Sequence, residues 1–240
     1  MNSRSLVIGY HGCELKLAKR LAAGGADLTP SRNLYDWLGN GQYIWEYSLE
    51  RGWQWALEAA KEGRIKTPAV IGVVVDLGKC LDLVEAEALQ IVRDAYQRYR
   101  HICQLSGSNE ERNRGIGFRA RYLDCMVFET LHAWRQQQGL PPFDTVRGFF
   151  VEGSELYPGA GLRDRDHIQI CVRNPQCIKG YFLPRLPINP VPRETRLRQG
   201  AKRVCSSSRS WVGSICWMRA LERSIFPAEA MMLARTAASP

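Results

Sequence analysis

The sequence predicts a mixed α+β fold, and two observations lead to that prediction. The 240 residues are 45% hydrophobic and 24% charged, a composition that can bury the core of one large domain. Apolar β-branched runs typical of strands are interspersed with segments whose apolar residues recur at helical spacing. No apolar run approaches the roughly 18–20 residues that cross a bilayer, and the stretch 5–10 is too short for a signal-peptide core. We therefore expect a cytoplasmic protein without a membrane partner.

The first half of the chain is expected to contain two strands and two helices. Glycines end both helical patterns, at Gly24 and at Gly63. The second strand is a continuous β-branched run, typical of a strand buried on both faces. In chain order we expect a strand at 6–8 that enters a turn at 10–12, a helix at 13–23, a loop at 28–41, a helix at 49–62 and a strand at 69–75.

The second half is expected to contain two helices followed by three strands. Of these strands, 167–172 alternates most regularly, with His167, Gln169 and Cys171 on one face. The expected elements are a helix at 86–102, a polar Gly-containing loop at 106–117, a helix at 123–138, and strands at 146–151, 167–172 and 178–182.

The chain divides by composition into a body, 1–186, and a basic extension, 187–240. The net charge of +9 consists of +6 in the extension and only +3 in the body, so the overall charge gives little support for nucleic-acid binding by the body. The extension is proline-broken and has no clean hydrophobic period, which favours a poorly ordered segment. A sharper hypothesis is that it is not a native ending, as after a shift of reading frame.

The eight cysteines contain no C-x-x-C pair, and the four histidines complete no zinc-ligand spacing. We expect reduced thiols, several of them core residues, and no metal site.

Three sequence features suggest a binding site when they are taken together. Gly9-Tyr10-His11-Gly12 follows an apolar run, and a glycine there would let a ligand approach the backbone. Gly39-Asn40-Gly41-Gln42-Tyr43 precedes further aromatic residues, so Tyr43 could present a ring for stacking. A helix carrying Trp53 and Trp55 comes next, followed by the buried strand 69–75. Taken singly, the first feature is more often a turn, and the second is more often a joint between a loop and a core strand.

In this order and spacing the sequence resembles the catalytic domain of the poly(ADP-ribose) polymerase branch of ADP-ribosyltransferases, the diphtheria-toxin-like class. The resemblance covers roughly residues 6 to 80, with a weaker similarity at 146–182. It implies split mixed or antiparallel sheets with flanking helices, and NAD as a substrate without a metal.

The resemblance also implies roles for individual residues. His11 corresponds to the histidine that contacts the adenosine ribose, and Gly12 to the glycine whose backbone holds the nicotinamide carboxamide. Tyr43 corresponds to the stacking tyrosine. Trp53 or Trp55 would close the other side of the nicotinamide. Ser48 corresponds to a serine that bonds the carboxamide, with shifted spacing.

The chain departs from the family at the third signature residue, a glutamate that starts a late strand. The strand 167–172 contains no acid. Gln169 is the best match and His167 the next, while Glu155 or Glu152 of the preceding loop could enter the site. The missing glutamate argues against chain-forming polymerase activity.

The leading hypothesis is therefore a mono-ADP-ribosyltransferase that acts on a protein or nucleic-acid acceptor. Such an enzyme could serve as a toxin or defence effector, and a toxin could have an antitoxin partner. Two alternatives stay open: a catalytically inactive NAD- or ADP-ribose-binding module, and an NAD-using enzyme similar to RNA 2′-phosphotransferases.

Overall fold

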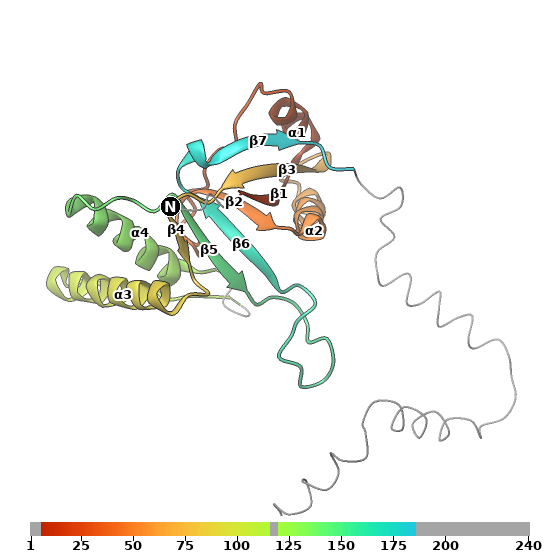
Figure 1. The fold of residues 1–240 in the computed structure, drawn as a ribbon. Helices are drawn as coiled ribbons and strands as arrows, with labels where there is room; N and C mark the ends of the chain where they lie inside the picture. Colours follow the sequence, from red (N-terminus) through yellow and green to blue (C-terminus); the bar gives the residue numbers. More distant parts are fainter. Residues whose placement is uncertain (1–5, 116–119, 186–240) are drawn as a thin grey trace, which may run out of the picture. The chain divides into compact units, whose positions relative to one another are not determined.

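The described residues, 6–115 and 120–185 of a computed structural model, form a mixed α+β unit, as the sequence predicts. Its seven strands make one sheet in the order β4-β5-β6-β2-β1-β3-β7 (Figure 1). The pair β4–β5 is parallel and every other pair is antiparallel. The elements are β1 (Leu6–Glu14), α1 (Leu15–Ala22), β2 (Gln42–Glu46), α2 (Leu49–Lys61), β3 (Pro68–Asp76), β4 (Cys80–Asp82), α3 (Ala86–Ser106), α4 (Tyr122–Gln137), β5 (Thr145–Phe150), β6 (His167–Val172), the short 3₁₀ helix η2 (Pro175–Cys177) and β7 (Ile178–Phe182).

Strands β1 and β2 separate in the middle of the sheet. They are paired only at Gly9 with Glu46 and at Tyr10 with Trp45. Beyond Tyr10, β1 continues to pair with β3 as far as Glu14, whereas β2 pairs with β6. The sheet is therefore parted on the C-terminal side of Tyr10, between the strand that carries His11 and the strand that begins at Gln42.

The helices cover both faces of the sheet. Helix α1 packs against β3 and β7, and α2 packs against β1 and β3 on the other face. Helices α3 and α4 pack on each other beside β4 and β5 (Figure 1). A buried cluster that includes Val146 and Cys171 joins α3 and α4 to the same face as α2. Between these two coverings, that face carries Trp45, Gln169 and His167.

Most of the expected elements are confirmed, and the clearest differences lie in β1, β2 and β4. The predicted turn at 10–12 is wrong, because the backbone there continues the ladder with β3. The strand β2 was not predicted as such, and β4, at three residues, is too short to show a hydrophobic period. The strands 167–172 and 178–182 fall where the pattern predicts them.

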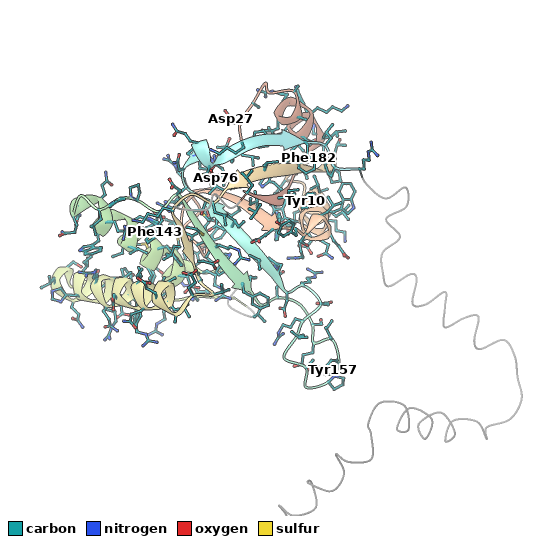
Figure 2. The ribbon with its side chains drawn as sticks, viewed as in Figure 1. Tyr10, Asp27, Asp76, Phe143, Tyr157 and Phe182 are labelled. Atoms are coloured by element: carbon teal, nitrogen blue, oxygen red, sulfur yellow. The ribbon has the colours of Figure 1, made fainter. Side chains whose placement is uncertain are left out.

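The loop between β5 and β6 extends away from the sheet, with Tyr157 near its end (Figure 2). Its base is closed by hydrogen bonds from the backbone N–H of Ser154 to Asp164 and of Glu152 to Asp166. Within the described ranges, no helix is long and apolar enough to cross a membrane. The extension from residue 187 lies outside them.

Gly41 gives a test of this packing. A Cβ at Gly41 would lie 2.5 Å from the Cys171 sulfur and 2.7 Å from the Val172 carbonyl oxygen. We expect Gly41→Ala to lower the free energy of unfolding by about 1–3 kcal/mol, because neither neighbour can move without disturbing β6. Gly180→Ala is the control, since no atom lies within 4 Å of its added Cβ. Urea unfolding of both variants measures the difference, and equal stability would show that β2 and β6 are less tightly packed than described.

Candidate functional site

His11 bridges the parting between β1 and β2. Its Nδ1 lies 2.8 Å from the Tyr43 carbonyl oxygen. A carbonyl can only accept, so Nδ1 carries the proton and Nε2 of the neutral ring is an acceptor. Burial lowers the pKa of His11, although the hydrogen bond to Tyr43 opposes this shift. The ring is therefore neutral near pH 7 and offers a lone pair at a fixed position.

Tyr43 is anchored by its hydroxyl group. The hydroxyl donates to the Gly39 carbonyl at 2.8 Å and accepts from the Leu38 N–H at 2.9 Å. Burial is the main cause that raises the pKa of this phenol well above its usual value, so it stays protonated. The Tyr43 hydroxyl thus holds the loop before β2 at Leu38 and Gly39. The Tyr43 residue itself is only half-buried.

Gln169 is held by Trp37, a residue for which the sequence suggested no role. The Trp37 indole N–H donates to the Gln169 side-chain oxygen at 2.5 Å. Gly148 stands opposite Gln169 on β5, and a Cβ there would lie 2.8 Å from the Trp37 ring. The glycine therefore lets the indole lie over β5 next to the glutamine. Residues 37 and 169 are 132 positions apart, so no spacing rule could have paired them.

A row of rings runs from this face of the sheet to His11 at the parting. Neighbouring ring centroids lie 4.8–6.5 Å apart, which is within the range of favourable aromatic contacts. The row runs Trp37, Phe150, His167, Trp45, Trp55, His11. Trp55 is thus the α2 tryptophan that lies beside His11.

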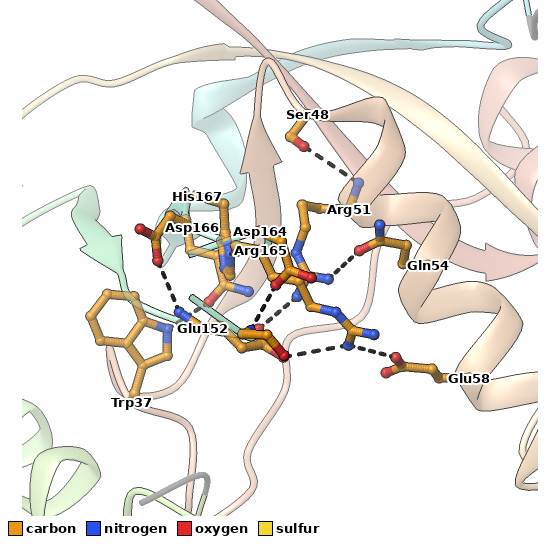
Figure 3. A network of polar contacts seen from close by, with 12 residues as sticks. Trp37, Ser48, Arg51, Gln54, Glu58, Glu152, Asp164, Arg165, Asp166 and His167 are labelled. Atoms are coloured by element: carbon orange, nitrogen blue, oxygen red, sulfur yellow. Dashed lines mark hydrogen bonds and ion pairs between the residues drawn. The ribbon is translucent and has the colours of Figure 1, made fainter. Parts of the chain in front are cut away.

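A charged network adjoins the row where α2 begins (Figure 3). Arg51 is 8% exposed and donates to Glu152 at 2.6 Å and to Gln54 at 2.5 Å. Arg165 donates to Glu58 at 2.9 Å and lies 4.0 Å from Glu152. The ion pairs tie the loop before β6 to α2, and they place a carboxylate, that of Glu152, on the same side of the sheet as Trp55.

Three nitrogen atoms here are buried without a hydrogen-bond partner among the described residues: Trp45 Nε1, Arg51 Nε and His167 Nε2. His167 Nδ1 donates to the Arg165 carbonyl at 2.6 Å, so Nε2 is an acceptor in the neutral ring. Burial, followed by the nearby Arg51 charge, lowers the pKa of His167. Buried polar atoms are normally paired. Their concentration at one place indicates a site that takes up water or a polar ligand.

The other sequence-predicted residues are distributed as follows. Gly12 lies against α2, because a Cβ there would strike the Gly52 carbonyl and the Trp55 ring. Ser48 caps α2 by accepting from the Arg51 N–H at 3.3 Å. Glu155 is exposed in the extended loop and accepts from the Gly159 N–H. The structure thus brings His11, Gly12, Tyr43, Trp55 and Gln169 to neighbouring elements, and it leaves Glu155 apart.

A second ion pair, between Glu129 and Arg173, holds the loop Gly39-Asn40-Gly41. Glu129 of α4 accepts from Arg173 at 2.7 Å and from the Asn40 N–H at 2.8 Å. Arg173 also donates to the Asn40 carbonyl at 2.9 Å. Gly39 has φ +80, and a Cβ there would meet the Glu129 carboxylate. The pair therefore holds the loop that leads to Tyr43, a role that the sequence did not indicate.

Two cavities lie next to this arrangement and not within it. One, of about 420 Å³, is lined mainly by apolar residues of α3 and α4 and by Trp37. The other, of about 820 Å³, adjoins Glu129, His132 and Arg173. Among the described residues, no group of three His, Cys, Asp or Glu side chains is arranged to hold a metal ion.

Comparisons of the chain with protein-family models, curated proteins and solved structures return no match.

The Glu129–Arg173 pair predicts a pH-dependent stability. Burial raises the pKa of Glu129, but the bonds from Arg173 and Asn40 outweigh it and leave the pKa below its usual value of 4.5. The stabilisation is therefore complete above that value and is lost as the pH falls through the lowered pKa. We expect Glu129→Gln to cost about 1–2 kcal/mol near pH 7 and less at about pH 3.5.

Urea unfolding at the two pH values measures this difference. Glu62→Gln is the control, because the pair between Glu62 and Arg64 is largely exposed and such pairs contribute little. A loss at Glu129 that is the same at both pH values would contradict the assignment.

Proposed function

We propose that this protein transfers ADP-ribose from NAD to a macromolecular acceptor, as a single group and not as a chain. The observation that supports this most is the adjacency of β1, β2 and β6 in the sheet. It brings the strands that carry His11, Tyr43 and Gln169, residues far apart in sequence, next to one another in the sheet. These are the positions at which the sequence resembles ADP-ribosyltransferases.

The geometry suits a nucleoside ligand. The acceptor nitrogen of His11 can take the proton of a ribose hydroxyl, because its other nitrogen is committed to Tyr43. The rings of Tyr43 and Trp55 supply aromatic surface for a planar heterocycle, and the Arg64 guanidinium already lies over Trp55, 4.9 Å from the ring centroid. In the proposed reaction the bond between nicotinamide and ribose breaks, and nicotinamide leaves as a neutral ring. The acceptor then bonds to the ribose carbon and releases its proton to solvent.

Glu152 is the carboxylate that we assign to the positively charged transition state. Gln169 has no charge, and Glu155 lies in the exposed part of the loop. Glu152, in contrast, is tied to Arg51 at the start of α2, next to the helical turn that packs on Gly12. A negative charge at this place would favour an oxocarbenium-like state.

The second candidate is a module that binds NAD or ADP-ribose without turnover. The observation that favours it is the same ion pair, because Arg51 offsets the charge of Glu152. Substitution of Glu152 separates the two functions, since only the transferase needs its charge.

The first experiment is nicotinamide release from NAD by the full chain, with and without cell lysate. We expect release that depends on lysate and falls at least 100-fold in His11→Ala, about the loss seen when a positioned transition-state group is removed. His101→Ala, an exposed histidine of α3, is the control. Release without lysate would indicate NAD hydrolysis. Full activity of His11→Ala would contradict the site.

Glu152→Gln tests the carboxylate. We expect a loss of turnover of about 10²–10³-fold with ADP-ribose affinity retained, because the amide keeps the shape and a bond to Arg51 but not the charge. Glu87→Gln, at an exposed position of α3, serves as the control. Unchanged turnover would move the role away from Glu152, and a wild-type protein that binds ADP-ribose without releasing nicotinamide would favour the binding module.

A further inference from the structure

We infer that Trp37 is a positioning residue that turns Gln169 into a hydrogen-bond donor toward the ligand. The inference rests on the proposed function, because it names what Gln169 offers to a nucleoside bound beside β6. A glutamate at this position would only accept hydrogen bonds, whereas Gln169 held in this way donates them.

The polarity follows from the Trp37 bond. An indole nitrogen can only donate, so the Gln169 atom that lies 2.5 Å from it must be the side-chain oxygen. The amide orientation, which is often ambiguous, is therefore fixed by chemistry. The oxygen is occupied, and the nitrogen carries two N–H groups for which the described chain shows no acceptor.

The surroundings keep this orientation in place. The Trp37 ring lies directly over Gly148 of β5 and packs on Phe150 with centroids 4.8 Å apart, so the indole has no room to move toward the strand. Trp45, the residue opposite Gln169 on β2, has a buried indole N–H without a partner in the described structure. Arg51 Nε is a further unpartnered donor nearby. Gln169, Trp45 and Arg51 thus present donors, next to the acceptor nitrogen of His167.

The ligand group that matches these N–H donors is an oxygen atom that accepts hydrogen bonds. A ribose hydroxyl oxygen, a carbonyl or a phosphate oxygen of the ADP-ribose unit meets this requirement. On the other side of the parting, His11 Nε2 is an acceptor. Gln169 and His11 thus offer opposite hydrogen-bonding groups to a ligand, the first a donor and the second an acceptor.

The first test needs no ligand. In ¹⁵N-labelled full chain, the Trp37 indole resonance is identified by its absence in Trp37→Phe. We expect Gln169→Leu to move it upfield, because the acceptor is removed, and Gln169→Glu to leave it downfield. Gln176→Leu, at an exposed position, is the control. An indole resonance that ignores Gln169→Leu would overturn the inference.

The second test is calorimetric titration with ADP-ribose. We expect Trp37→Phe to weaken binding about fivefold, the equivalent of one ordinary hydrogen bond. Gln169→Glu should weaken it at least as much, because the carboxylate keeps the Trp37 bond but offers lone pairs and repels the ligand's phosphates. Trp134→Phe is the control for the loss of an indole away from the site.

The outcomes separate the inference from the proposed function. If Gln169→Glu binds ADP-ribose as tightly as the wild type or more tightly, Gln169 is not a donor and the inference fails while the function stands. If the wild type does not bind ADP-ribose, the proposed function and the ligand assignment fail together. The indole resonance then decides alone whether Trp37 fixes the amide.

Discussion

The parting of β1 from β2 is the constraint on which the rest of the site depends. Two paired strands would have used the Tyr43 carbonyl in the ladder. Because β1 and β2 are not paired beyond Tyr10, that carbonyl accepts from the His11 side chain. The parting therefore opens backbone groups in the middle of the sheet and fixes the histidine tautomer at the same time. The chain leaves β2 at Tyr47, in a left-handed conformation with φ 50, and Ser48 then caps α2.

Glycines allow the surrounding elements to approach this parting. Gly12 permits α2 to lie against β1, Gly148 permits Trp37 to lie over β5, and Gly41 permits the loop before β2 to lie against β6. In each case the neighbour occupies the place of a Cβ. The close packing follows because helix and indole fill the space that side chains at these positions would otherwise occupy.

The sequence predicted the local elements well and their contacts poorly. Periodicity placed the helices and the strands 167–172 and 178–182, because these depend on residues close in the chain. It failed at 10–12, where the partner strand β3 decides the conformation. It could not find the bond between Trp37 and Gln169 or the support of Asn40 by Glu129, which join residues 132 and 89 positions apart. The residues of the site were therefore predictable as members of a pattern, but the groups that orient them were not.

In the proposed site, charge is distributed so that ligand recognition and chemistry would reside in different residues. Neutral groups, His11 and Gln169, are oriented by neutral partners and can bind a ribose without an ion pair. The acidic group, Glu152, is held at the entrance of the loop by Arg51. A carboxylate that shares an arginine contributes its charge only in part, because the arginine competes for it.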